Sequence, residues 1–150
     1  MSRYMNLIGQ NARKASLDKV NSRTKNKILK RYAFLLGKEK KSILKANQKD
    51  IQFALGKGLK NNLIERLTID EKKLIGIKNS IDKIANLKDP VDTTLEKWHR
   101  PNGLTISRVS IPIGVIGVVY ESRPNVTSDV ASLCFKSGNA VILKGGSEAI

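Results

Sequence analysis

IPIGVIGVVYESRPNVTSDVASLCFKSGNAVILKGGSE, residues 111–148, is the stretch of this chain that decides its fold. Residues 115–120 (VIGVVY) form an apolar, β-branched run that suits a strand buried on both faces of a parallel sheet. Residues 126–137 carry apolar side chains at helical spacing, and residues 140–143 (AVIL) form a second short apolar run. The pattern predicts a right-handed β-α-β crossover in an α/β protein, with ligands outside the carboxyl ends of the strands.

Polar residues fill the two turns that follow the predicted strands. The first, ESRPN at 121–125, leads into the helix, which Asn125 or Thr127 could cap and which Gly138-Asn139 would close. At the carboxyl end of a strand, the side-chain amide of Asn125 could instead donate to a developing oxyanion. The residues alone do not decide between these two roles of Asn125, helix cap and oxyanion donor.

The second turn is Lys144-Gly145-Gly146-Ser147, which follows a strand and precedes a helix start capped by Ser147. Free backbone N–H groups, absent side chains and one amine suit an anionic or ribose-bearing ligand. Because the lysine comes before the glycines, the spacing is not that of a P-loop, and no G-x-G-x-x-G occurs. A plain tight βα turn is the alternative interpretation.

Composition limits the classes of protein that the chain could represent. Its 150 residues could hold one globular domain, and no apolar run reaches the length of a membrane-spanning helix or a signal peptide, so a cytoplasmic location is expected. One cysteine excludes an internal disulfide framework, and with a single histidine the sequence offers no cluster of thiolates and imidazoles for a zinc site.

The net charge of +15 raises the alternative of a basic helical nucleic-acid-binding protein. Residues 1–100 hold a net +14 and residues 101–150 a net +1, and the excess is spread over every predicted helix with few aromatic residues. This distribution favours a lysine-rich, solvated surface over a nucleic-acid face.

The first ninety residues predict helices, and the next twenty predict an antiparallel ribbon. We expect five helices: residues 4–17, Asn21 or Ser22 to Gly37, about Lys38 to Leu55, 61–67, and Thr68 or Asp70 to the break at Asp89-Pro90. The last of them has an apolar stripe formed by Leu74, Ile75, Ile77, Ile81, Ile84 and Leu87. Residues 93–99 and 103–112 alternate apolar and polar around a Pro101-Asn102-Gly103 turn. An isolated two-stranded ribbon is marginal in water, so we expect it to pair with a second subunit.

Three long motifs give the chain a family resemblance. RPNGL at 100–104, P-x-GVIGVVYESRPNVT at 112–127 and SLCFKSGNAVILKGGSEA at 132–149 resemble the gamma-glutamyl phosphate reductases, which belong to the aldehyde dehydrogenase superfamily. The resemblance implies an aldehyde-dehydrogenase-like fold with a helical segment (1–90), an oligomerisation-type ribbon (91–112) and the first β-α-β unit of an incomplete, Rossmann-like NADP-binding sheet (113–150). It also implies NADPH-dependent reduction of L-glutamyl 5-phosphate to glutamate 5-semialdehyde, the second step of proline synthesis, in a homo-oligomer.

The resemblance implies roles for single residues too. Asn125 stands where the superfamily has an oxyanion-hole asparagine, and Lys144, Gly145, Gly146 and Ser147 stand in its ribose-binding turn. Superfamily members place a glutamate three residues after that lysine. Here Ser147 occupies the position, which favours the 2′-phosphate of NADPH. Arg123 is a candidate for binding a substrate anion, with a salt bridge to Glu121 or another surface acid as the alternative.

Such enzymes need a thiolate that attacks the acyl phosphate and expels phosphate. Cys134 is the only thiol, but it lies on the apolar stripe of the predicted helix between Leu133 and Phe135, where a small buried hydrophobe is expected. By resemblance the nucleophile belongs to a downstream catalytic domain that residues 1–150 do not contain. We therefore expect the chain to be the amino-terminal portion of a longer protein and to be inactive by itself.

Overall fold

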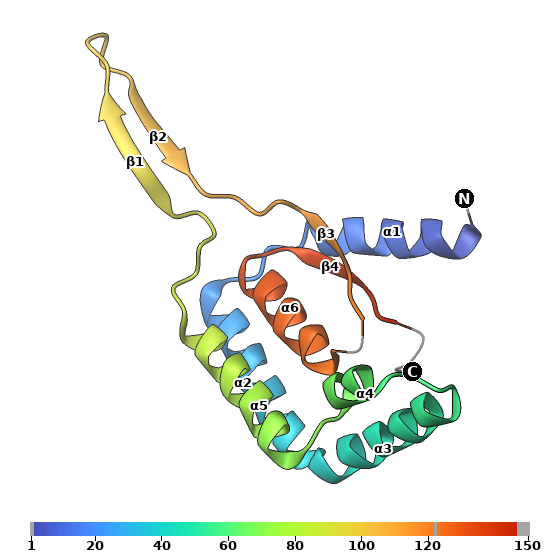
Figure 1. Ribbon diagram of the computed structural model, residues 1–150. Coiled ribbons are helices and arrows are strands. Elements are labelled where there is room, and N and C mark those ends of the chain that lie inside the picture. The colour runs from blue at the N-terminus through green and yellow to red at the C-terminus, as the bar shows by residue number, and fades with distance from the viewer. Residues whose placement is uncertain (1, 122, 147–150) are drawn as a thin grey trace.

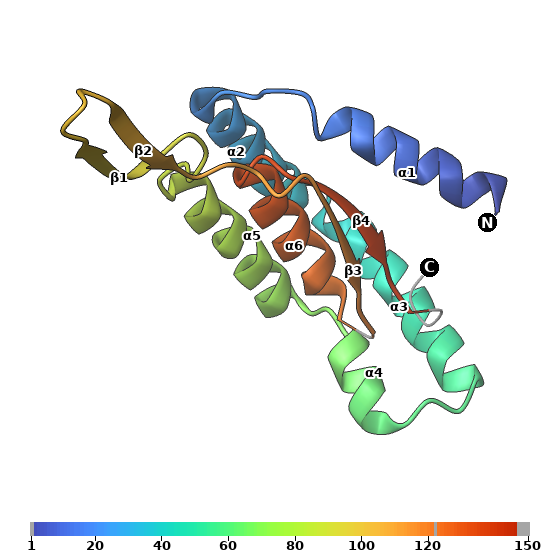
Figure 2. The same cartoon turned by 90° about the horizontal axis from the view of Figure 1, so that it is seen from above.

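The computed structural model describes residues 2–121 and 123–146, which form layers of helices and strands beside a projecting ribbon (Figure 1). The helices α2, α5 and α6 lie side by side, and the strand pair β3-β4 lies between α6 and α1 in both views (Figure 2). The elements are α1 (Arg3–Ala15), α2 (Ser22–Lys38), α3 (Lys40–Gly56), α4 (Asn61–Leu67), α5 (Glu71–Asn86), β1 (Thr94–His99), β2 (Thr105–Val109), β3 (Val115–Val119), α6 (Pro124–Lys136) and β4 (Ala140–Lys144).

The core lies where α2 and α5 meet. Leu29 and Ala33 of α2 pack against the buried face of α5, and the two alanines Ala33 and Ala85 leave room for close approach of the helices. The buried residues of α5 are Leu74, Ile77, Ile81, Ile84 and Ala85. The predicted stripe is therefore right in period, but it is wrong at Ile75 and Leu87, which are both more than half exposed.

Two predicted helix starts are confirmed by side-chain caps. The Asn21 side chain accepts a hydrogen bond of 2.9 Å from the backbone N–H of Thr24, and Asp70 accepts one of 2.6 Å from Lys73. Each carboxamide or carboxylate oxygen thus satisfies a donor that the first helical turn leaves free.

The predicted β-α-β unit is present, with β3 parallel to β4 and Val115 paired with Ala140. Its helix closes as expected: Gly138 adopts a positive φ of 73°, and the N–H of Asn139 donates to the Cys134 carbonyl at 2.8 Å. The expectation of strands buried on both faces is wrong, since Val119 is 81% exposed. The described sheet holds only this strand pair, and α1 and α6 cover it only in part.

The predicted cap of α6 is wrong as well. Arg123 holds the N-cap position, Pro124 begins the helix, and no side chain among the described residues accepts a capping hydrogen bond from its first turn. Asn125 and Thr127 both lie inside the first turns, because proline fits the first helical position and moves the start towards it.

The ribbon is the predicted antiparallel pair. β1 and β2 pair Trp98 with Ile106 and His99 with Thr105, and Gly103 takes a φ of +83° in the connecting turn. Every residue of both strands is exposed, and the ribbon extends away from the helices (Figure 1).

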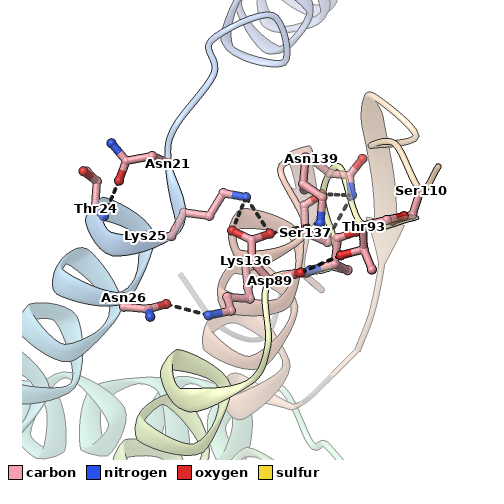
Figure 3. A network of polar contacts seen from close by, with 12 residues as sticks. Asn21, Thr24, Lys25, Asn26, Asp89, Thr93, Ser110, Lys136, Ser137 and Asn139 are labelled. Carbon is pink, nitrogen blue, oxygen red and sulfur yellow. Dashed lines mark hydrogen bonds and ion pairs between the residues drawn. The ribbon is translucent and has the colours of Figure 1, made fainter. Parts of the chain in front are cut away.

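A buried polar network ties the helical layer to the chain that leads into the ribbon (Figure 3). The Lys25 ammonium donates to both carboxylate oxygens of Asp89 at 3.0 and 3.1 Å. Lys136, at the end of α6, donates to the Asn26 side chain at 2.5 Å and to the Ala85 carbonyl at 3.1 Å. Lys25 and Lys136 are 2% and 3% exposed, so the solvated surface predicted for the lysines does not include these two.

Burial alone would raise the pKa of Asp89, but the N–H of Val91 and the Lys25 ammonium outweigh it and hold the pKa below its usual value. Burial also lowers the pKa of Lys136, an effect that the nearby Asp89 carboxylate opposes. The carboxylate of Asp89 therefore balances two buried ammonium groups.

Asp89→Asn is expected to destabilise the chain by about 3 kcal/mol, because it leaves buried cations without their counter-charge. Urea unfolding at neutral pH measures this loss. Since the pKa of Asp89 is lower in the folded than in the unfolded chain, its carboxylate stabilises the fold fully above the unfolded pKa of about 3.9. This stabilisation is lost as the pH falls through the folded pKa. Asp82→Asn, which removes the half-exposed partner of Lys78, is the matched control and should cost less than about 1 kcal/mol. Equal losses would contradict the role of the network.

Candidate functional site

A cavity of about 510 Å³ opens where β3 ends and α6 begins. One wall comes from the α4–α5 region, and the other from the start of α6, which lies beside α4 in both ribbon views (Figure 2). Its polar lining residues are Arg66, Thr68, Lys73, Ser80, Arg123, Asn125 and Asp129. The cavity thus joins the predicted ESRPN turn to a part of the chain almost sixty residues earlier.

Asn125 lies on this cavity in the first turn of α6, where its side chain is not a cap. Its Nδ2 donates to Oδ2 of Asp129, one turn further along, at 3.3 Å. Because a carboxylate only accepts, this contact turns the amide nitrogen of Asn125 towards Asp129, and none of the described residues accepts a hydrogen bond from the second N–H of that nitrogen. The cap interpretation of Asn125 is wrong, and the geometry suits a hydrogen-bond donor.

Arg123 lies on the same cavity and is exposed. Of the carboxylates in residues 2–121 and 123–146, none forms an ion pair with it, so the expected alternative of a bridge to Glu121 is not seen. Arg123 is also the N-cap residue of α6, and the backbone N–H groups and the dipole at that end of the helix favour an anion.

The second turn lies at the same sheet edge but outside this cavity. Val119 pairs with Lys144, so the two strands end side by side, and Lys144 is exposed. A Cβ built on Gly145 would lie 3.6 Å from the hydroxyl of Tyr120, whose oxygen is 2.5 Å from that of Thr127. Tyr120 therefore links the glycine turn to the start of α6. Ser147 falls outside the described residues.

Cys134 is 6% exposed, and burial raises the pKa of its thiol. The expectation of a small buried hydrophobe is confirmed, and a thiol with a raised pKa is a poor nucleophile.

Two other polar residues lie on the ribbon, far from the cavity: Arg108 pairs with Glu96 at 3.5 Å, and His99 contacts Thr105 at 2.9 Å.

Sequence reasoning missed the α4–α5 wall of the site. Arg66 and Lys73 carry no local motif, and their meeting with Asn125 depends on how the helices pack. The contact between Asn125 and Asp129, in contrast, joins residues four apart on α6 and could have been predicted from that spacing. In the described part of the chain, no group of three His, Cys, Asp or Glu side chains could hold a metal ion. None of the helices described is both long and apolar enough to cross a membrane.

The helical layer, the projecting ribbon and the parallel β-α-β unit with polar turns at one edge define an aldehyde-dehydrogenase-like α/β fold. No family model matches the chain. Curated relatives do, and the chain is homologous to the amino-terminal part of the gamma-glutamyl phosphate reductases.

The similarity is high in sequence and in structure. The chain is 50% identical to the reductase of Caldanaerobacter subterraneus over 131 residues, which are 87% of this chain and 32% of that protein. Crystal structures of the reductases from Thermotoga maritima and Saccharomyces cerevisiae match with TM-scores of 0.88 and 0.93 at 41% and 36% identity. These matches cover 93% and 99% of this chain and 34% and 38% of theirs.

The chain spans about a third of the length of the relatives that it matches. The resemblance seen in the sequence motifs is confirmed, whereas the nucleic-acid-binding alternative finds no support among these relatives.

We expect the Cys134 thiol to react slowly with a thiol-labelling reagent in the folded chain and rapidly in urea, because only the exposed thiolate reacts. Labelling rates at mildly alkaline pH measure the difference. The control is the double variant Cys134→Ala/Leu133→Cys, which places the thiol on the half-exposed neighbouring position of α6. Similar rates for the two folded proteins would show that Cys134 is accessible.

Proposed function

We propose that the chain forms the amino-terminal part of an enzyme that reduces L-glutamyl 5-phosphate with NADPH to glutamate 5-semialdehyde and phosphate, in proline biosynthesis. The 50% identity over 131 residues to a gamma-glutamyl phosphate reductase is the observation that carries this proposal. The cavity supports it, since an amide donor and cationic side chains converge there, as an acyl phosphate requires.

In this proposal Asn125 donates its free N–H to the oxygen of the glutamyl carbonyl as negative charge develops on it. The neighbouring backbone N–H groups at the start of α6 add positive potential, and Asp129 orients the amide. Arg123 contacts the phosphate, which its guanidinium can bind through paired hydrogen bonds. The nucleophilic thiol is supplied from outside residues 1–150, because Cys134 is buried.

The turn after β4 is proposed as the cofactor contact. NADPH supplies the hydride, and its ribose 2′-phosphate would be held by Lys144, Gly145, Gly146 and Ser147. Lys144 fits because its side chain is exposed at the carboxyl end of a strand, and no described carboxylate forms an ion pair with it. The glycines fit because a backbone without side chains lets a phosphate approach.

The domain division follows from the same proposal. Residues 1–90 form a helical segment, 91–112 an oligomerisation ribbon and 113–150 the first β-α-β unit of the NADP-binding domain. The exposed Leu95, Trp98 and Ile106 of the ribbon support pairing with a second copy in a homo-oligomer. An enzyme of amino-acid biosynthesis that uses NADPH is expected in the cytoplasm.

The full-length polypeptide that contains this chain should reduce NADP⁺ when given glutamate 5-semialdehyde and phosphate, the reverse of the proposed reaction. Asn125→Ala should lower kcat about a hundredfold or more, as the loss of one oxyanion donor does. The absorbance of NADPH measures the activity of the unaltered polypeptide and of the Asn125→Ala variant. Asn6→Ala, at an exposed position of α1 that lines no part of the cavity, is the matched control and should leave kcat unchanged. Phosphate-independent activity, or none, would overturn the proposed function.

Lys144→Ala should raise the KM for NADPH about tenfold and leave the KM for NADH nearly unchanged, because only NADPH offers a 2′-phosphate to the ammonium. Steady-state kinetics with both cofactors measure this, and Lys30→Ala at an exposed position of α2 serves as the control. An unaltered enzyme that uses NADH as well as NADPH would contradict the role given to Lys144 and Ser147.

A further inference from the structure

The wall of the cavity opposite Asn125 is unusually well anchored for a short helix and a loop. Leu67, at the end of α4, is fully buried. The buried Asn47 of α3 donates to the Leu67 carbonyl at 2.9 Å and accepts from the N–H of Ile69 at 2.6 Å. The residue just before Leu67 is Arg66, so these contacts fix the backbone that presents Arg66 to the cavity.

Lys73 strengthens this wall from α5. Its ammonium donates to the Glu65 carbonyl at 2.9 Å and to the Thr68 carbonyl at 2.8 Å, which closes the carboxyl end of α4. Two of its three protons are thus committed to the backbone, and Lys73 acts on the cavity mainly through its charge. The guanidinium of Arg66, in contrast, forms no ion pair with the described carboxylates and remains available.

The charges of the cavity match a dianion. Arg66, Lys73 and Arg123 face one carboxylate, that of Asp129, which leaves an excess of two positive charges. L-glutamyl 5-phosphate carries a phosphate of about −1.5 to −2, one carboxylate and one ammonium, so its net charge is close to −2. The ligand of the proposed function and the cavity are therefore complementary in charge.

We propose that Arg66 is the specificity residue that binds the α-carboxylate of the glutamyl substrate, an inference that rests on the proposed function. Asn125 and Arg123 place the acyl phosphate at the start of α6, and the amino-acid end of the substrate extends towards α4. Asp129 repels a carboxylate on its own side of the cavity, so the α-carboxylate turns to Arg66, whose planar guanidinium binds it through two hydrogen bonds.

The test removes the carboxylate from the substrate and the arginine from the enzyme in turn. The full-length polypeptide is assayed in the reverse direction with glutamate 5-semialdehyde and with 4-aminobutanal, which keeps the amine and the aldehyde but lacks the α-carboxylate. Arg66→Gln should lower kcat/KM for glutamate 5-semialdehyde tenfold or more, mostly through KM, and change kcat/KM for 4-aminobutanal less than about twofold. Arg66→Lys should restore part of the loss.

Arg13→Gln, an exposed arginine of α1 that lines no part of the cavity, should change neither value. Equal losses with both substrates, or no loss with either, would overturn the role of Arg66 while the reductase activity stands. An unaltered protein without phosphate-dependent NADP⁺ reduction would overturn the proposed function and this inference with it. Thermal unfolding of each variant separates a folding defect from a change in substrate binding.

Discussion

The buried contact between Lys25 and Asp89, with Lys136 beside it, is the constraint on which the arrangement of the helices depends. Removing these charges from water costs several kcal/mol each, so the network adds little to net stability. The network does determine which helix surfaces meet, because a packing that buried a lysine ammonium without its carboxylate or carbonyl partners would be far less stable. Lys25 lies on α2, Asp89 just beyond α5 and Lys136 at the end of α6, so their partners specify one packing of that layer.

The same network also fixes the position of the cavity, because it holds α6, the helix that forms one wall of the cavity. The helix is held at its carboxyl end, where Lys136 contacts Asn26 and the Ala85 carbonyl, and its other end carries Asn125 and Asp129. The opposite wall belongs to α4, α5 and the loop between them; α5 packs on the same core, and Asn47 of α3 holds the end of α4. Both walls are therefore parts of one packed layer, so the distance between an amide donor and the cations facing it is set by helix packing, not by a mobile loop.

The features that depend on neighbouring residues could be predicted from the sequence. Asn21 and Asp70 cap their helices, Gly103 turns the ribbon and Gly138 ends α6, because each effect acts within a few residues. The features that depend on packing could not be predicted. Arg66 and Asn125 meet at one cavity across 59 positions, and Lys25 and Lys136 are buried although lysine is rarely so. The half-exposed strands also depend on which elements cover them, which a run of apolar residues does not specify.

Two parts of the chain differ in how their apolar side chains are stabilised. The helical layer buries its own core, whereas Ile111, Ile113 and Val119, along the path from the ribbon into the sheet, are 75%, 83% and 81% exposed. At about 25 cal/mol per Å² of apolar surface, covering such side chains would contribute on the order of 1.5–3 kcal/mol each. Under the proposed function these are the surfaces on which the rest of the reductase and a second subunit pack. The substrate cavity, in contrast, is already formed by the helices of this chain.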